Sequence, residues 1–332
     1  MEPLIIKDDF PDELFHLSAS ELADYLKQPT LFHLKGKLAD PLFFSVLLHG
    51  NEDTGWKMIQ QLLKKYTKTE LPRSVSVFIG NIHAAKYNLR RLENQPDFNR
   101  IWQFDSDLPE YQMAETVYIE MQQRGIFASV DIHNNTGKNP FYGCINRLEV
   151  DFIKLAYSFA EPIIYFQQPA SVQSNAFSKL CPAITLECGQ PGSQAGVDFA
   201  LNYAERLLNL ENFDQLPMPD KKPDILHTFA TVKIPPFIDY AYENKNCEVS
   251  LKSDLEEQNF KIVPKNSVIA ESKVGMPFVI TNEKQEDITN ELFYEEKGQI
   301  KNKVDIIPSM VTLNIDVIRQ DCYCYLMEPF EY

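Results

Sequence analysis

The sequence has no hydrophobic run long enough to cross a membrane and no leader-like N-terminus. No segment approaches the ~20 consecutive apolar residues of a membrane-spanning helix. The first residues, Met-Glu-Pro-Leu-Ile-Ile-Lys-Asp-Asp, lack the basic start and apolar stretch of a secretory signal. Six cysteines are scattered without Cys-x-x-Cys spacing. These absences predict a cytoplasmic protein with reduced thiols and no membrane partner.

Positive charge is also scarce. The chain has 32 lysines and arginines against 47 acidic residues, a formal net charge of −15. A nucleic-acid-binding surface needs a basic face to neutralise phosphates, so this net charge argues against nucleic acid as a partner. A small anionic substrate stays compatible with this charge, because a few clustered arginines can outweigh a distant field.

What the chain does have is the composition of a globular protein with room for two domains. It has 332 residues, of which 44% are hydrophobic, 12% aromatic and 24% charged. From about residue 30 to 210, short β-rich runs alternate with helical patterns, as in an α/β domain with a largely parallel sheet. The predicted strands are 42–48, 74–80, 127–133, 162–166 and 183–187. The predicted helices are 20–27, 54–66, 110–124 and 196–210.

The composition changes near residues 212–223, where three prolines stand among charged residues. Beyond them the pattern is strand-like, over 229–234, 260–263, 268–271, 278–281, 310–318 and 323–327. We therefore predict an α/β domain over residues 1–220, with a mixed, largely parallel sheet flanked by helices. A smaller all-β domain is predicted over residues 221–332.

The most informative motif is His49-Gly-Asn-Glu52, at the end of an apolar strand. Six histidines and 47 acids in 332 residues predict about one His-x-x-acid pair by chance, and this is the single one in the sequence. His133 ends another predicted strand, Phe127–His133. Because ligands gather at the carboxyl ends of parallel strands, His49, Glu52 and His133 could converge there. Two histidines and a glutamate form the ligand set of an open catalytic zinc site.

Three further segments contain residues that could take part in catalysis or bind an anion. Asp131 is either a second acceptor behind a ligand imidazole or a turn cap. Glu187 ends the predicted strand 183–187 and is either a general base or a surface acid. Residues 80–100 concentrate Arg90, Arg91 and Arg100, whose guanidinium groups either bind carboxylates or pair with surface acids.

Taken in order, four motifs resemble the succinylglutamate desuccinylase/aspartoacylase branch of the zinc carboxypeptidase superfamily. They are His49-Gly-Asn-Glu52-Asp-Thr-Gly, Gly80-Asn with Asp97-Phe-Asn-Arg100, Asp131-Ile-His-Asn-Asn-Thr and Thr185-Leu-Glu-Cys-Gly. The resemblance spans about residues 42–210, and family members commonly add a smaller C-terminal β domain. The form Asp-Phe-Asn-Arg departs mildly from the more usual Asp-Leu-Asn-Arg or Asp-Met-Asn-Arg.

The resemblance implies a role for each matching residue. His49, Glu52 and His133 would hold one zinc ion, and Glu187 would be the catalytic proton-transfer group. Asn99 and Arg100 would bind the substrate carboxylate. Either Arg90 or Arg91 would polarise the scissile carbonyl, since the segment 92–96 is longer than usual in the family. We also expect Asn134, beside His133, to contact substrate.

The implied activity is hydrolysis of an N-acyl amino acid or a similar small amide that bears a carboxylate. A metallocarboxypeptidase acting on peptides or cell-wall fragments is the alternative enzyme, and a binding protein without turnover is a third reading. The acyl group, the amino acid and the oligomeric state stay open, with a homo-oligomer compatible with the sequence.

Overall fold

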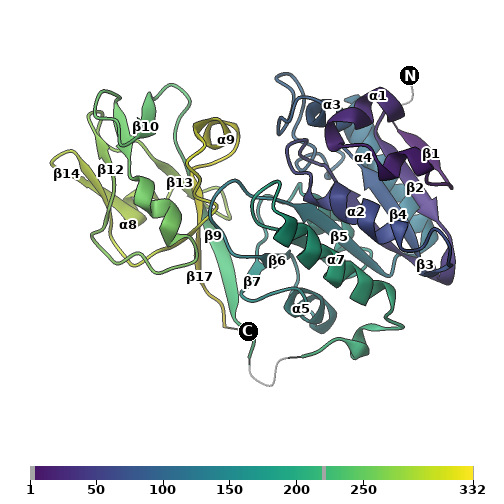
Figure 1. The fold of residues 1–332 in the computed structure, drawn as a ribbon. Coiled ribbons are helices and arrows are strands. Elements are labelled where there is room, and N and C mark those ends of the chain that lie inside the picture. The colour runs from purple at the N-terminus through teal and green to yellow at the C-terminus, as the bar shows by residue number, and fades with distance from the viewer. Residues whose placement is uncertain (1–3, 219–221, 332) are drawn as a thin grey trace. The chain divides into compact units, whose positions relative to one another are not determined.

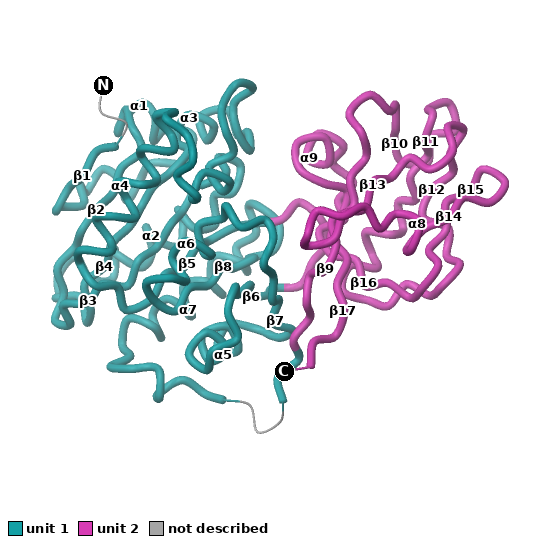
Figure 2. Tube along the Cα trace, turned by 180° about the vertical axis from the view of Figure 1, so that it is seen from behind, with its two compact units in different colours: residues 1–134, 141–224 teal, residues 135–140, 225–332 magenta. Residues whose placement is uncertain are grey.

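The computed structural model describes residues 4–218 and 222–331 (Figure 1). It divides into two compact units (Figure 2). Unit 1 comprises Met1–Asn134 and Phe141–Asp224, and unit 2 comprises Asn135–Pro140 and Ile225–Tyr332. The predicted boundary between residues 220 and 221 lies outside the described residues. In the structure the division follows Asp224, and the short stretch Asn135–Pro140 belongs to unit 2, which the sequence did not indicate.

Unit 1 is built on a mixed sheet that is parallel at most of its strand pairs. Only the pairs β2–β4 and β6–β8 are antiparallel among its described pairs. In spatial order the strands are β1 (Ile5–Lys7), β2 (Thr30–Leu34), β4 (Leu71–Ile79), β3 (Gly36–Val46), β5 (Ala128–His133), β8 (Ala183–Glu187), β6 (Tyr142–Ile145) and β7 (Ile163–Tyr165). The central strands are buried on both faces, which explains why β3 ends in a run of buried residues that is apolar except for Ser45. The α/β class predicted from the sequence is confirmed.

Helices cover both faces of this sheet. They are α1 (Leu22–Leu26), α2 (Thr54–Lys64), α3 (Ile82–Ala85), α4 (Pro109–Arg124), α5 (Val150–Tyr157), α6 (Gln173–Phe177) and α7 (Gln194–Leu208). On one face, Gly55 of α2 lies so close to β3 that an added Cβ would be 2.8 Å from a Val46 methyl group. On the other, Phe43 of β3 stacks on Phe177 of α6 with ring centroids 4.7 Å apart. Because successive side chains of β3 point to opposite faces of the sheet, the strand packs against the helices on both faces.

Unit 2 is a β-rich unit with its own apolar core. β9 (Ile225–Lys233) pairs with β13 (Val279–Asn282) and with β17 (Cys324–Pro329), which also pairs with β16 (Ile307–Ser309). A second sheet has the order β10 (Tyr240–Tyr242), β11 (Val249–Leu251), β12 (Val268–Ser272), β15 (Gln299–Asn302) and β14 (Phe293–Glu296). Val232, Ile280 and Tyr323 are fully buried in the shared core.

Two of the predicted strands in unit 2 are wrong. Residues 310–318 form a loop followed by helix α9 (Ile315–Gln320), because the Asn314 side chain caps the helix by accepting from the backbone N–H groups of Asp316 and Val317. Residues 260–263 contribute only an isolated bridge from Val263 to Ile306. A second short helix, α8 (Thr289–Leu292), was also not predicted.

The stretch Asn135–Pro140 is held tightly inside unit 2. Asn139 Oδ1 accepts from the Met310 N–H at 3.0 Å, and Thr136 donates to the Thr312 hydroxyl at 2.8 Å. Only glycine fits at position 137, since a Cβ there would lie 2.0 Å from the Val311 carbonyl oxygen. The chain therefore runs directly from the end of β5 into contacts that belong to the C-terminal unit.

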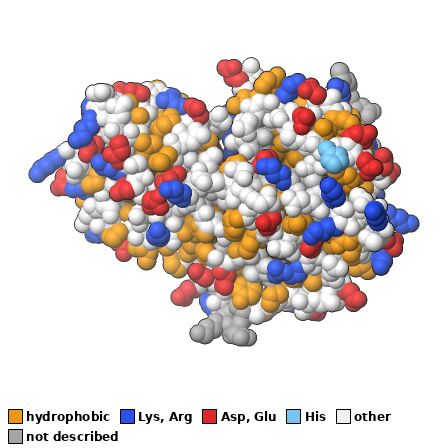
Figure 3. Space-filling view, in the orientation of Figure 1, with side chains coloured by type: hydrophobic (Ala, Val, Ile, Leu, Met, Phe, Trp, Pro, Cys, Tyr) orange, Lys and Arg blue, Asp and Glu red, His pale blue; other side chains and the backbone are white. Residues whose placement is uncertain are grey.

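The surface agrees with the sequence charge. On the face drawn in Figure 3, acidic and basic side chains are interspersed, and no broad basic area is visible outside the grey residues. In the described part of the chain, no helix combines the length and apolarity that a bilayer crossing needs.

Candidate metal centre

The turn after β3 brings His49 and Glu52 together. Leu47 takes a left-handed φ of 57° and turns the chain away from the strand. Position 50 must be glycine, because a Cβ would lie 2.2 Å from the Ala85 backbone nitrogen. The Gly50 N–H donates to the Arg90 carbonyl oxygen at 3.1 Å, which fixes the turn against the segment that carries the arginines. Helix α2 then begins at Thr54, two residues after Glu52.

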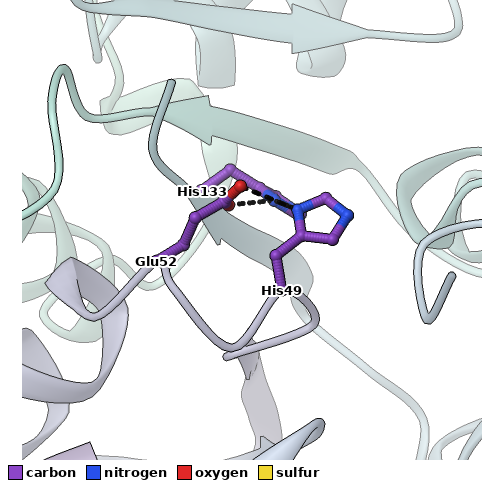
Figure 4. Close-up of side chains that lie close together, drawn as sticks. All are labelled: His49, Glu52 and His133. Atoms are coloured by element: carbon purple, nitrogen blue, oxygen red, sulfur yellow. Dashed lines mark hydrogen bonds and ion pairs between the residues drawn. The ribbon is translucent and has the colours of Figure 1, made fainter. Parts of the chain in front are cut away.

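His133, the last residue of β5, completes a buried cluster with His49 and Glu52 (Figure 4). Glu52 Oε1 lies 2.8 Å from His49 Nδ1, and Glu52 Oε2 lies 2.8 Å from His133 Nδ1. The two Nδ1 atoms are 3.2 Å apart. Each side chain offers one ligand atom, and the three atoms lie within 4.8 Å of one another. The donor set of two imidazoles and a carboxylate suits zinc.

Both imidazoles are oriented by carboxylates on their far side. His49 Nε2 lies 3.0 Å from Asp97 Oδ1, and His133 Nε2 lies 2.8 Å from Asp131 Oδ2. A ligand histidine commonly donates its second N–H to a carboxylate, which fixes the tautomer and leaves the other nitrogen for the metal. Asp131, itself held by the Ser45 hydroxyl at 2.5 Å, thus has the position of an orienting acceptor and not of a turn cap.

The cluster keeps its charged groups ionised. Burial favours the neutral form of Glu52, but the neighbouring His49 and His133 outweigh it and lower the pKa of this carboxyl. Burial likewise favours a neutral His133, but Asp131 and Glu52 outweigh it and raise the pKa of the imidazole well above its usual value. Burial also opposes ionisation of Asp97, where Arg90 and His49 prevail and hold the pKa of the carboxyl well below its usual range. The carboxyl groups of Glu52 and Asp97 are therefore ionised, and each is paired with a neighbouring positive charge.

Glu187 lies beside the cluster on the neighbouring strand. It ends β8, and in the parallel β5–β8 ladder it is the register partner of His133. Adjacent strands are about 4.8 Å apart, and register partners share a face of the sheet. Glu187 is 8% exposed, so it is a buried acid and not the surface acid that the sequence left open.

A family model, the succinylglutamate desuccinylase/aspartoacylase catalytic domain, matches residues 43–210, which is half of the chain. The chain belongs to this family. The match begins within β3 and ends two residues after α7, and so includes every residue of the metal cluster. The resemblance seen in the four sequence motifs is confirmed.

Solved structures related to the family share the fold across most of the chain. Succinylglutamate desuccinylase from Chromobacterium violaceum is 18% identical, with a TM-score of 0.56 over 89% of this chain and 86% of that one. The enzyme from Vibrio parahaemolyticus is 12% identical, with a TM-score of 0.63 over 96% of both chains. Murine aminoacylase 3 is 16% identical, with a TM-score of 0.57 over 89% and 95%. Comparison with curated proteins gave no match.

Arg90 and Arg91 make different contacts in the structure. Arg90 binds Asp97 Oδ2 through Nε and Nη2 at 3.1 and 3.0 Å, and its Nη1 lies 3.9 Å from Glu52 Oε1. Arg91 Nη1 donates to the backbone oxygen of Gln95 at 2.9 Å. Asp97 therefore links Arg90 to His49, and of the two arginines Arg90 is the one that reaches the metal cluster.

Asn99 and Arg100 lie next to the cluster. Asn99 Nδ2 is 3.3 Å from His133 Nε2, and its Oδ1 accepts from the Gln173 N–H at 2.9 Å, at the start of α6. Arg100 is half-buried, and its Nη1 donates to the Asn99 carbonyl oxygen at 2.9 Å. The pair is thus within the site, and its proposed contact with a substrate carboxylate stays a prediction.

Asn134 ties three site segments together. Its amide nitrogen donates to the Thr54 hydroxyl at 2.9 Å and to the Gly189 carbonyl oxygen at 2.8 Å. Its Oδ1 accepts from the Thr54 N–H at 3.3 Å, and its backbone N–H donates to Glu52 Oε2 at 3.1 Å. The substrate contact expected of Asn134 stays a prediction, whereas the structure uses the side chain to join the segments after Glu52, His133 and Glu187.

Sequence reasoning gave no role to two residues that the structure places here. Asp97 appeared only as part of the Asp-Phe-Asn-Arg motif, and its position behind His49 depends on the tertiary fold. Ser45 is a polar residue inside the apolar run of β3, and that interruption is the signal that could have found it.

Proposed function

We propose that the protein is a zinc-dependent amide hydrolase that removes the acyl group from an N-acyl amino acid or a similar small amide bearing a carboxylate. The observation that carries the proposal is the buried cluster of His49, Glu52 and His133, whose far-side partners leave both Nδ1 atoms turned toward Glu52. Membership of the desuccinylase/aspartoacylase family supports amide hydrolysis as the reaction class.

The residues present fit a single zinc ion. His49 and His133 would bind it through Nδ1 and Glu52 through its carboxylate, a three-ligand set that leaves a position open. When bound, zinc supplies Lewis acidity toward a carbonyl group and makes a water molecule more acidic.

The chain's own groups supply the remaining chemistry. Glu187 would take a proton from the attacking water and return it to the departing amine, which its burial and its register with His133 support. Arg90, which makes two hydrogen bonds to Asp97, would stabilise negative charge on the carbonyl oxygen. Arg100 and Asn99 would bind the substrate carboxylate, since a guanidinium fork matches a carboxylate in geometry.

A substrate panel tests this function. Zinc-loaded protein is offered N-acetyl, N-succinyl and N-formyl amino acids and short peptides, before and after treatment with a chelator. We expect release of the free amino acid from at least one N-acyl class, loss of the activity on chelation and recovery on adding zinc. Release of C-terminal residues from peptides alone would replace the proposal by the carboxypeptidase alternative. Tight binding without turnover would indicate a binding protein.

Arg90 and Arg91 form a matched pair for mutagenesis. Replacing Arg90 with alanine is expected to lower kcat by about 10²–10³-fold, because it removes a donor aimed at the developing oxyanion. Arg91→Ala removes the same charge from a half-buried side chain that binds the Gln95 backbone and not Asp97, so it is expected to change kcat less than about threefold. Zinc content is measured for both variants, since Arg90 also holds Asp97 behind His49. A larger loss in Arg91→Ala would reverse the assignment.

A further inference from the structure

The backbone N–H of Gln173 determines which way the Asn99 amide faces. It donates to Asn99 Oδ1 at 2.9 Å, and because a backbone N–H is a donor only, the oxygen of this amide must point toward Gln173. The Nδ2 group therefore lies on the other side of the amide, 3.3 Å from His133 Nε2. Asn99 thus presents N–H donors beside the metal cluster, and a carboxylate is an acceptor of such donors.

The N–H of Gln173 is available for this contact because Gln173 is the first residue of α6. The first N–H groups of a helix have no partner within the helix. The first intrahelical bond of α6 runs from the Ala176 N–H to the carbonyl oxygen of Val172, at 3.2 Å. The contact with Asn99 therefore satisfies a donor that the helix leaves unpaired.

The side chain of Gln173 attaches the start of α6 to β5 (Figure 2). Its Nε2 donates to the Ser129 hydroxyl at 2.9 Å, and both side chains are 0% exposed, so water does not compete for the bond. Its Oε1 is buried without a partner in the described part of the chain. Since a hydroxyl both donates and accepts, either orientation of the amide keeps the bond. Ser129 shares a face of the sheet with Asp131 and His133, two and four residues later.

Aromatic side chains join the same segments. The Trp102 N–H donates to the Ser171 carbonyl oxygen at 3.1 Å, and the Trp102 ring meets the Phe177 ring edge to face, with centroids 5.7 Å apart. Phe177 in turn stacks on Phe43 of β3. The segment 97–102 is therefore packed on α6, and α6 is packed on the sheet.

We propose that Gln173 is a positioning residue for substrate binding. Its side chain holds α6 on Ser129, and its backbone N–H holds the Asn99 amide so that Nδ2 can donate to the substrate carboxylate. Gln173 acts through Asn99 and does not itself touch the substrate. The kinetic consequence rests on the proposed function, whereas the positioning of Asn99 does not.

Steady-state kinetics of Gln173→Met and Ser129→Ala test the proposal. Each variant removes one partner of the same hydrogen bond, and methionine keeps nearly the length and volume of glutamine. We expect KM for the best N-acyl amino acid to rise about tenfold, because the hydrogen bond from Asn99 to the carboxylate is misplaced, with kcat within about twofold and zinc content unchanged. Gln122→Met, the same substitution at an exposed position of α4, is expected to keep the wild-type KM.

A double-mutant cycle with Asn99→Ala distinguishes positioning from a general loss of structure. Because Gln173 acts through Asn99, Gln173→Met is expected to have no further effect on KM once Asn99 is replaced. Far-ultraviolet circular dichroism identifies the folded variants, and either Gln173→Met or Ser129→Ala is sufficient for the test. A wild-type KM in the folded variants, or an equal rise of KM with and without the Asn99 side chain, overturns the proposal.

Hydrogen exchange provides a measurement that does not require hydrolysis. The Trp102 N–H, bonded to Ser171, is expected to exchange at least about tenfold faster in Gln173→Met and in Ser129→Ala, while the amides of the β2–β4 ladder keep their wild-type rates. If the wild type hydrolyses no member of the substrate panel, the proposed function fails and the exchange rates decide the positioning. A wild-type exchange rate at Trp102 in the folded variants then overturns it.

Discussion

Replacing His133 with alanine is expected to lower zinc affinity by more than about 100-fold and to abolish hydrolysis at limiting zinc. The imidazole contributes one of three proposed ligand atoms, and even the partners behind such ligands are worth about 10–100-fold in metal affinity. Asp131→Asn, which weakens the acceptor 2.8 Å behind His133, is expected to fall within that smaller range. Zinc affinity is measured by competition with a chromophoric chelator, and bound zinc by elemental analysis.

A histidine outside the cluster provides the control. His16 is exposed and lies outside the metal cluster, so His16→Ala is expected to bind zinc like the wild type. Far-ultraviolet circular dichroism shows whether His133→Ala keeps its fold. A folded His133→Ala that retains zinc at wild-type affinity would contradict the assigned ligand set.

Replacing Glu187 with glutamine is expected to lower kcat by about 10²–10⁴-fold while zinc stays bound. Glutamine has nearly the same shape but cannot accept and return a proton, and general acid–base catalysis contributes about this factor. Zinc should stay because Glu187 is not one of the three clustered ligand residues. This separation of activity from metal content distinguishes Glu187 from Glu52, whose replacement is expected to lose both.

Glu149→Gln is the matched control, since Glu149 precedes α5 in the same unit and its side chain is 66% exposed. We expect its kcat to stay within about twofold of the wild type, as for most surface substitutions. The comparison requires steady-state kinetics with the best substrate of the panel and zinc analysis of each preparation. A loss below tenfold in Glu187→Gln would show that another group transfers the proton.

The parts of the fold that were predicted correctly are those in which local sequence and tertiary environment agree. The strand predicted over 183–187 matches β8 at both ends, and the helix predicted over 110–124 differs from α4 by one residue. The short strands β1 and β2, by contrast, were not predicted. The strand predicted over 310–318 is wrong because the Asn314 side chain caps a helix that begins at Ile315.

The site was predictable where residue type alone carries the chemistry, as for His49, Glu52 and His133. The sequence could not show which of Arg90 and Arg91 would polarise the carbonyl. Two adjacent arginines have the same chemistry, and they differ only in the residues that the fold places next to each. The contact of Arg90 with Asp97 supports Arg90 as the proposed residue. That contact joins residues seven positions apart and depends on a turn that the sequence pattern does not fix.

The placement of Asn135–Pro140 within the C-terminal unit has a consequence for how the protein is made. These residues follow His133 by a single residue, yet their partners, such as Met310 and Thr312, lie about 170 positions later in the chain. At a synthesis rate of about 5–20 residues per second, the ribosome needs roughly 10 s or more to produce them. The loop that follows β5 can therefore take its final form only after almost the whole chain has been synthesised, and a nascent α/β unit lacks it.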